Sequence, residues 1–252
     1  MKIDLNNKVL LVTGASRGIG AAVAKMAGQS GGSVAVHANS NLASAKQLAK
    51  DIGNGSEAFE ADLGNTHAVI RLYHGIIDTY GRIDVLINNA GIAIHSPLSQ
   101  SEDEWINDWH QTLNVNLLAA GILCKLTIPN FKERGSGIII NISSRAAHRG
   151  DTPDYLAYAA SKGGMESLTK SIARAYGKDN ITAFGVAPGF TRTAMAKDFI
   201  DTYGEDYAVQ DLALSELTEP QDVAQIVLFL ASGLGKHATG TTIDVNAGSY
   251  VR

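Results

Sequence analysis

Short runs of apolar, largely β-branched residues recur along the whole chain, separated by longer stretches with helical periodicity. Most of these runs are apolar at consecutive positions, which is typical of strands buried on both faces, as in a parallel sheet covered by helices. The strand candidates are Val9–Thr13, Val34–Ala38, Ala58–Ala61, Val85–Asn88, Ile138–Ile142, Thr182–Val186 and Thr242–Val245. The helix candidates are Ile19–Gly28, Leu42–Ile52, Ala68–Tyr80, Tyr155–Tyr176 and Asp222–Ala231.

This alternation predicts right-handed βαβ crossovers and an α/β fold: a doubly wound Rossmann sheet of seven mostly parallel strands, with helices on both faces. The sequence has no repeat and no linker rich in Pro, Gly or Ser, so we expect one domain over residues 1–252. The least regular stretch follows the carboxyl end of a strand, where such folds bind ligands. Residues 190–217 are therefore expected to form either a substrate lid or a solvated loop.

Composition excludes several classes of protein. The net charge is −4, with acidic and basic residues interspersed, so nothing indicates a nucleic-acid partner. No apolar stretch reaches the roughly 18 residues of a membrane span, and Met1 to Lys8 is too short and polar for a signal peptide, which predicts a cytoplasmic protein. The single Cys124 is expected to be a buried, inert thiol. His110, His148 and Cys124 have no ligand spacing, so no metal is expected.

A glycine-rich segment, Thr13 to Gly20, directly follows the first strand and opens the first helix. Glycines at 14, 18 and 20 let the backbone turn tightly and approach a pyrophosphate closely. The amide groups and the positive dipole end of the helix would then face the anion. A glycine-rich turn without a ligand is the alternative, but the position in the first βα unit favours dinucleotide binding.

The spacing Gly-x-x-x-Gly-x-Gly resembles that of the short-chain dehydrogenase/reductase family, and the resemblance extends over essentially the whole chain. Asn88-Asn89-Ala90-Gly91 closes the fourth strand as the family's Asn-Asn-Ala-Gly motif does, and Pro188-Gly189 follows the sixth strand. Residues 244–248 resemble the family's carboxyl-terminal strand, with Ala247 where Gly is common. The branch that the chain most resembles contains the 3-oxoacyl-acyl-carrier-protein reductases and related carbonyl reductases.

The resemblance implies a set of cofactor-binding residues. Asp62 stands where family members contact the adenine, and Thr193 where they bind the nicotinamide carboxamide. The implied residues are Gly14, Ser16, Arg17, Gly18, Ile19, Gly20, Asn39, Ser40, Asp62, Leu63, Asn89, Ala90, Gly91, Tyr158, Lys162, Pro188, Gly189, Thr191 and Thr193.

The end of the second strand bears on the choice of cofactor. NAD-selective folds place an acid there to bind the ribose 2′-hydroxyl, whereas this chain has Asn39 and Ser40 after Ala38. An acid would repel a 2′-phosphate, so its absence permits NADP. Arg17 resembles the arginine that NADP-preferring members direct at that phosphate. The sequence therefore predicts NADP(H) over NAD(H), with His37 as a rim residue.

Tyr158 and Lys162 stand at i and i+4, on one face of a predicted helix. Tyrosine ionises near pH 10, too high for an efficient base at neutral pH, and a fixed cation beside it stabilises the phenolate. We therefore expect Tyr158 to be the catalytic acid/base, with its pKa lowered by Lys162 and by an oxidised nicotinamide. The resemblance further implies that Lys162 binds the nicotinamide ribose. Tyr155 has Ala159 four residues on and lacks this partner.

Two further catalytic residues come from the resemblance. Ser144 matches the serine that hydrogen-bonds the substrate oxygen like an oxyanion-hole donor; Ser143 would face the opposite side of a continuing strand. Asn116 aligns best with the asparagine that anchors a proton-relay water to Lys162, and Asn114 stays an alternative.

The substrate is less well defined. The loop from Ile92 to Pro97 and the segment from Phe190 to Tyr207 would shape a moderately apolar pocket, from Ile92, Ile94, His95, Phe190, Met195 and Phe199. Acyl-carrier reductases dock their acidic carrier with two basic residues near the site. Arg134 fits the first position, but Asp179 stands at the second.

Three functions remain open. The preferred one is an NADPH-dependent reductase of a ketone or of a 3-oxoacyl carbonyl, which could be carrier-bound. The others are an NAD(P)-dependent alcohol or sugar dehydrogenase and a non-catalytic nucleotide-binding regulator, against which the intact Ser144, Tyr158 and Lys162 count. The resemblance implies a homodimer or homotetramer, assembled through the regions 107–131 and 155–176 and the carboxyl-terminal strand.

Overall fold

The computed structural model describes residues 3–196 and 209–251. Its strands form one sheet of seven in the order β3-β2-β1-β4-β5-β6-β7, and every neighbouring pair is parallel. The strands are β1 (Val9–Val12), β2 (Ser33–Ala38), β3 (Glu57–Glu60), β4 (Val85–Asn88), β5 (Gly137–Ile142), β6 (Ile181–Pro188) and β7 (Thr242–Val245). The doubly wound parallel sheet expected from the consecutive apolar runs is thus confirmed.

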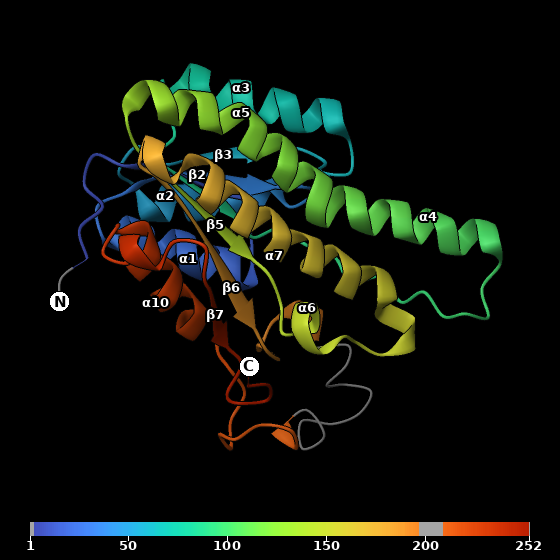
Figure 1. Cartoon of the computed structure of the whole chain (residues 1–252). Coiled ribbons are helices and arrows are strands. Elements are labelled where there is room, and N and C mark those ends of the chain that lie inside the picture. The colour runs from blue at the N-terminus through green and yellow to red at the C-terminus, as the bar shows by residue number, and fades with distance from the viewer. Residues whose placement is uncertain (1–2, 197–208, 252) are drawn as a thin grey trace.

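Helices cover both faces of this sheet (Figure 1). On one face, α1 (Gly18–Gln29), α2 (Leu42–Ile52) and α10 (Pro220–Ala231) share a buried apolar cluster with β1 and β2. On the other, α3 (Thr66–Tyr80), α5 (Ala119–Arg134) and α7 (Leu156–Tyr176) share a second cluster. The central strands β1 and β4 are wholly buried, as strands with a helix layer on each side must be.

A long helical rod crosses the second face. It consists of α4 (Glu102–Leu113), a π-helical turn (Asn114–Leu118) and α5. By length and composition alone it is the one helix of the described residues that could cross a membrane. In its most apolar window 44% of the residues are buried, because α5 packs against α3 and the sheet. This rod lies where the sequence placed one of the two long helices of the subunit interface.

Most boundaries fall within two residues of the sequence prediction. The first strand ends at Val12 instead of Thr13, and β6 continues to Pro188. Tyr155 belongs to a short 3₁₀ turn (Pro153–Tyr155), so α7 begins at Leu156. A short helix, α6 (Ala146–Arg149), separates β5 from this turn. The expected lid at 190–217 lies partly outside the described residues, which omit 197–208.

The strand order places a crevice at the carboxyl edge of the sheet. Because β1 pairs with β2 on one side and with β4 on the other, the connections leaving β1 and β4 run in opposite directions. Ligands of doubly wound folds bind at such a switch point. The loops that follow β1, β4, β5 and β6 all meet there, and they carry most of the residues singled out from the sequence.

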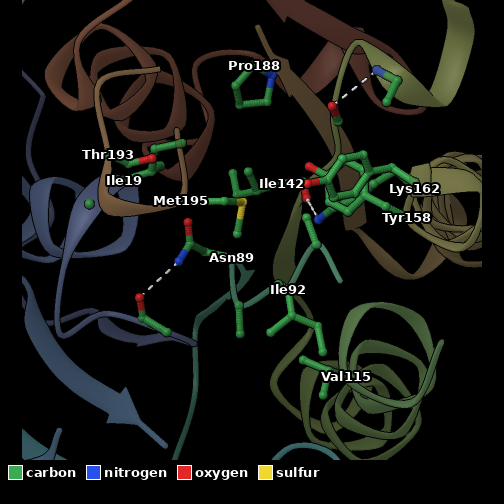
Figure 2. Close-up of a pocket in the computed structure, with 18 of the residues that line it drawn as sticks. Ile19, Asn89, Ile92, Val115, Ile142, Tyr158, Lys162, Pro188, Thr193 and Met195 are labelled. Carbon is green, nitrogen blue, oxygen red and sulfur yellow. Dashed lines mark hydrogen bonds between the residues drawn. The ribbon is translucent and has the colours of Figure 1, made fainter. Parts of the chain in front are cut away.

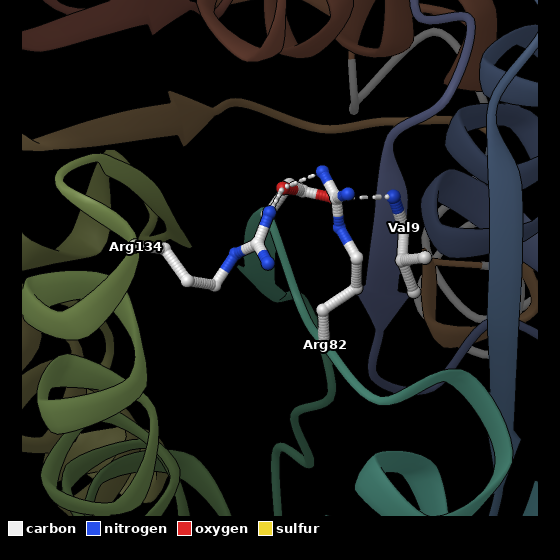
Figure 3. A network of polar contacts seen from close by, with 4 residues as sticks. Val9, Arg82 and Arg134 are labelled. Atoms are coloured by element: carbon white, nitrogen blue, oxygen red, sulfur yellow. Dashed lines mark hydrogen bonds and ion pairs between the residues drawn. The ribbon is translucent and has the colours of Figure 1, made fainter.

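Arg134 lies at the opposite, amino edge of the sheet. Its Nη2 is 3.3 Å from Oδ1 of Asp84, which also binds Arg82 and accepts a 2.8 Å hydrogen bond from the Val9 N–H (Figure 3). Because α5 runs antiparallel to the strands, its last residues cannot reach the carboxyl edge of the same chain. The expectation of Arg134 near the site is therefore wrong within one chain. Asp179, at the second docking position, pairs with Lys132 at 3.2 Å.

Candidate active site

A cleft of about 2230 Å³ opens at the carboxyl edge of the sheet. It is lined by the glycine loop after β1, by the ends of β2, β4 and β5, by α7 and by the segment after β6. This volume exceeds the roughly 300–1,000 Å³ of a typical small-molecule pocket, so the cleft can hold a dinucleotide together with a second molecule.

The glycine loop brings backbone close to backbone. Gly14 has a φ of +63°, and a Cβ there would lie 2.9 Å from the Cα of Ala90. A Cβ on Gly20 would lie 2.5 Å from both the Gly14 carbonyl oxygen and the Asn89 Nδ2. At Arg17, the N-cap of α1, no side chain caps the helix. The first amide groups of α1 thus keep their hydrogens directed into the cleft, which fits a bound pyrophosphate.

Thr13 and Asn89 join the ends of β1 and β4 beneath this loop. The Thr13 hydroxyl accepts hydrogen bonds from the N–H groups of Asn89 at 2.9 Å and Ala90 at 3.0 Å. The Asn89 amide in turn donates to the carbonyl oxygens of Thr13, at 2.8 Å, and of Gly14, at 3.2 Å. The Asn-Asn-Ala-Gly motif therefore sets the position of the glycine loop.

His37 is buried, contrary to the expectation of a rim residue. Only 1% of it is exposed, and it lies between the glycine loop and the end of β3. Its Nδ1 accepts a 3.0 Å hydrogen bond from the Gly14 N–H, so its Nε2 carries the hydrogen and donates to the Ala61 carbonyl oxygen at 3.0 Å. Burial lowers the pKa of His37, while the bond to Ala61 raises it in part. The neutral His37 ring therefore helps to hold the glycine loop in place.

The residues expected to bind the adenosine half line one end of the cleft. Asn39, Ser40 and Asp62 are exposed there, and Leu63 is buried beside them. Oδ1 of Asp62 accepts a 2.8 Å hydrogen bond from the Gly64 N–H, which fixes the turn after β3. Arg17 is exposed at the same end of the cleft.

Tyr158 and Lys162 lie on the other side of the cleft, with Ile19 and Thr193 across from them (Figure 2), and Ser144 adjoins Tyr158. The Lys162 Nζ lies 5.8 Å from the centre of the Tyr158 ring and donates a 2.8 Å hydrogen bond to the Ile142 carbonyl oxygen. The Ser144 hydroxyl forms a hydrogen bond with Tyr158 and also accepts one from the Ala146 N–H at 3.1 Å. The Ser143 hydroxyl instead donates a hydrogen bond to the Lys162 carbonyl oxygen at 3.3 Å.

The pKa of Tyr158 is raised in this structure, contrary to the expected lowering. Burial is the largest cause, the hydrogen bond with Ser144 opposes it, and the charge of Asp151 adds to it. Lys162 is itself buried, which lowers the pKa of its amine to about 8. Lys162 therefore loses its proton more readily than an ordinary lysine, and its charge does not offset the effect of burial on the pKa of Tyr158. A tyrosine in this state keeps its proton at neutral pH, as a proton donor must.

The π-helical turn between α4 and α5 positions Asn116. Its side chain is fully buried: Oδ1 accepts from the Ile92 N–H at 2.8 Å, and Nδ2 donates to the Ile92 carbonyl oxygen at 2.9 Å and to Ser161 at 3.0 Å. A Cβ on Gly91 would lie 3.5 Å from that Oδ1 and 3.3 Å from the Lys162 Nζ, so the three residues adjoin. Asn114, the alternative, lines the cleft. Such π turns often mark functional sites.

The segment after β6 closes the site. Pro188, Gly189, Thr191 and Thr193 all line the cleft, and a Cβ on Gly18 would lie 3.2 Å from the Thr193 side chain. Thr193 therefore lies against the glycine loop. Thr191 is buried, with its hydroxyl 3.2 Å from the Gly189 carbonyl oxygen.

Comparisons with known proteins decide the family. A family model described as enoyl-(acyl carrier protein) reductase matches residues 14–250. A 3-oxoacyl-[acyl-carrier-protein] reductase FabG from Staphylococcus epidermidis is 34% identical over 248 residues, which cover 97% of this chain and 100% of that one. The chain belongs to the short-chain dehydrogenase/reductase family.

Other members of this family show how varied its chemistry is. A 3β-hydroxysteroid dehydrogenase from Eggerthella lenta is 33% identical over 97% of this chain and 94% of its own. A dehydrogenase/reductase from Sinorhizobium meliloti superposes with a TM-score of 0.91 at 31% identity, over 99% and 98% of the two chains. A Beutenbergia cavernae protein with bound NADP at low occupancy, provisionally named an NAD(P)-dependent gluconate 5-dehydrogenase, has a TM-score of 0.90 at 28% identity, over 99% of each chain.

The substrate side of this short-chain dehydrogenase/reductase is more polar than expected. Of the predicted pocket residues, Ile92, Phe190 and Met195 line the cleft together with His95, and Ile94 does not line it. Phe199 lies outside the described residues. His95 lies 3.4 Å from Asp154. Polar residues that the sequence did not single out also line the cleft, among them Arg145, Arg149, Asp151, Thr152, Asp154, Gln210 and Asp211. The position of Arg145 directly after Ser144 was the available signal.

Proposed function

We propose that the chain is an NADPH-dependent oxidoreductase that reduces a ketone to an alcohol, with Tyr158 as the proton donor. The observation that carries this proposal is the Tyr158 phenol, which is hydrogen-bonded to Ser144 and has the Lys162 amine beside its ring, in a cleft that starts at the N-terminus of α1. A non-catalytic regulator would need none of these three side chains.

A bound nicotinamide supplies a hydride to the substrate carbonyl carbon. Ser144 would hold the carbonyl oxygen by a hydrogen bond, and Tyr158 would protonate that oxygen as it gains negative charge. Lys162 uses one N–H on Ile142 and has two left, which would bind the nicotinamide ribose hydroxyls. Asn116 and the neighbouring Asn114 are our candidates for anchoring the water that resupplies the proton.

NADP(H) is the proposed cofactor. Arg17 and the neutral Asn39 and Ser40 line the same end of the cleft, where a 2′-phosphate would find a cation and uncharged hydrogen-bonding groups. The NADP bound to the Beutenbergia cavernae protein supports this choice.

A dehydrogenase acting on a polar alcohol or sugar in the oxidising direction is the second candidate. The charged and hydroxyl-bearing side chains between Arg145 and Asp154 favour it, since they suit a hydroxylated substrate better than a long acyl chain. The FabG relatives favour reduction of a 3-oxoacyl group, and the pairing of Arg134 with Asp84 at the far edge of the sheet counts against it.

We also propose a cytoplasmic homodimer or homotetramer. Exposed apolar side chains on the long helical rod and at the carboxyl terminus support assembly: Ile106 is 46% exposed, Leu118 45% and Val251 81%. Sedimentation of the purified chain would measure the state.

A panel of carbonyl compounds tests the function. It contains simple ketones, oxo acids, oxidised sugars and 3-oxoacyl thioesters, each assayed with NADPH and with NADH. We expect NADPH consumption with at least one class and a higher kcat/KM for NADPH than for NADH. Failure to consume either cofactor with any class, by protein that binds NADPH, would contradict the proposal and favour a regulator.

A further inference from the structure

Arg145 stands at the centre of the polar part of the cleft. It directly follows Ser144 and lines the cleft, and its guanidinium carbon lies 4.6 Å from the centre of the Phe190 ring. An arginine stacked on an aromatic face has its plane fixed by the ring, and its N–H groups lie in that plane. The substrate side of the site therefore contains an oriented guanidinium.

One nitrogen of the Arg145 guanidinium has no hydrogen-bond partner among the described residues. This nitrogen, Nη1, is buried and makes no hydrogen bond to any residue that the structure describes. Within the part of the chain that the structure describes, Arg145 also has no ion pair. Buried polar groups are nearly always paired, and the exceptions point to a functional use or to a missing ligand. The missing partner of Arg145 would be an acceptor that enters from the cleft.

Asp211 and Asp151 both act on Arg145 through their charges, but neither carboxylate lies within ion-pair distance of its guanidinium. Arg149 has its own carboxylate, with its Nη1 3.3 Å from Oδ2 of Asp211. Oδ1 of Asp151 accepts a 2.8 Å hydrogen bond from the Thr152 N–H. Arg145 and Arg149 both act on Asp151 through their charges, and burial opposes them by raising the pKa of its carboxyl group. Two arginines and two carboxylates thus share this region, and among the described residues it is Arg149, not Arg145, that has a carboxylate in direct contact.

We propose that Arg145 binds a carboxylate of the substrate, so that the substrate is an oxo acid and the product the corresponding hydroxy acid. The inference rests on the proposed function, which it narrows to one substrate class. The planar fork of arginine matches the two oxygens of a carboxylate and can bind both. The carboxylate itself does not react: the carbonyl carbon gains hydride from NADPH, its oxygen gains the Tyr158 proton, and NADP⁺ is released.

The proposal separates this chain from a 3-oxoacyl reductase. A 3-oxoacyl thioester would place an uncharged group beside Arg145, where an oxo acid would place its carboxylate. The long pantetheine arm has no anion close to the reacting ketone. It also separates the chain from a reductase of simple ketones. The arginine fork can also bind two oxygens of a phosphate, so phosphorylated ketones form a distinct arm of the test.

The experiment compares each oxo acid with its uncharged methyl ester. Short 2-oxo and 4-oxo acids and oxo sugar acids are assayed with NADPH beside their methyl esters and beside phosphorylated ketones. We expect at least one acid to have a kcat/KM about 10- to 100-fold above that of its ester, the range that a charge-assisted hydrogen bond provides. Esters reduced as fast as their acids, or phosphorylated ketones reduced in their place, would overturn the proposal.

Variants test the residue itself. Arg145→Met should raise KM for the acid by about 10- to 100-fold, with no comparable change in KM for the methyl ester. The KM of Arg145→Lys for the acid should lie between those of the wild type and Arg145→Met, because lysine keeps the charge and lacks the planar fork. Arg174→Met removes an exposed arginine from α7 and is the matched control. Melting temperature and NADPH binding show that each variant is folded. A loss of acid and ester turnover together would contradict a role in carboxylate binding.

Binding keeps the two proposals distinguishable. If no carbonyl is reduced, the proposed function fails, and the corresponding hydroxy acids are then titrated into the NADP⁺-bound protein. A rise in melting temperature with the wild type that is absent in Arg145→Met supports a carboxylate site in a protein that does not reduce carbonyls. An absence of any such rise overturns the inference as well.

Discussion

The Nδ1 of His37 accepts a hydrogen bond from the backbone N–H of Gly14 at 3.0 Å, which links the end of β2 to the glycine loop. This bond requires the ring to be neutral, because a protonated imidazole has no acceptor. The other ring nitrogen, on the Ala61 carbonyl oxygen, keeps the ring in one orientation. The shape of the cofactor-binding loop therefore depends on the protonation of a residue one layer below it.

Acid should weaken the fold through His37. Burial lowers its pKa below the ordinary 6.5, so the unfolded chain binds this proton more readily than the folded one does. The stabilisation is complete above about pH 6.5 and is lost as the pH falls below that value. Melting curves and NADPH titrations between pH 5 and 8 should show wild type losing stability and affinity more steeply than His37→Gln. Parallel profiles would show that His37 does not carry this dependence.

Replacement of Lys162 by methionine should stabilise the protein while it abolishes activity. The pKa of the buried amine is about 8, far below its ordinary 10.5, so below pH 8 the fold bears the full cost of holding that charge. We expect a gain on the order of 1 kcal/mol or more at pH 7, or about 2–4 °C per kcal/mol in a chain of this size. The gain should shrink as the pH rises from 8 toward 10.5. A lower melting temperature at pH 7 would contradict it.

Ala247 offers a stability test away from the chemistry. Its φ is +52°, a left-handed conformation in which the Cβ of alanine is crowded. Ala247→Gly should relieve that strain, offset in part by the greater freedom of glycine in the unfolded chain, for a net gain of about 0.5–1 kcal/mol. Gly248→Ala, at a φ of +75°, is the opposite change and should destabilise. Chemical denaturation measures both.

Arg17 should govern the choice of cofactor. Arg17→Ala is expected to weaken NADPH binding by about tenfold or more, because it removes the cation opposite the 2′-phosphate, and to leave NADH binding within about twofold. Lys25→Ala, an exposed cation on the same helix, is the control. Fluorescence titrations give both dissociation constants, and an equal loss for the two cofactors would refute a role in selectivity.

The sequence predicted the sheet because runs such as Leu10 to Val12 and Val85 to Ile87 are apolar at every position, which only a strand buried on both faces requires. It brought Tyr158 and Lys162 together because an i, i+4 spacing fixes geometry within one helix. Local periodicity decides both features, so both can be predicted from the sequence alone.

The rest depended on contacts between distant segments. His37 looked like a rim residue because no local pattern reveals that Gly14 and Ala61 close over it. The raised pKa of Tyr158 reflects burial by the whole cleft, which its neighbours in sequence do not disclose. The polar substrate side combines residues near 145–154 with Gln210 and Asp211, and only the folded chain brings these two segments to one cleft.

Tyr158 is the proposed proton donor, and its substitution tests the proposed mechanism most directly. The rate of NADPH consumption is measured with the best carbonyl of the panel for wild type, Tyr158→Phe and Tyr155→Phe. Loss of the proton donor should lower kcat of Tyr158→Phe by about 10²- to 10⁴-fold with NADPH affinity nearly unchanged. Tyr155 has Ala159 and not a lysine four residues on, so Tyr155→Phe should keep most of the wild-type activity. Wild-type turnover by Tyr158→Phe would contradict the mechanism.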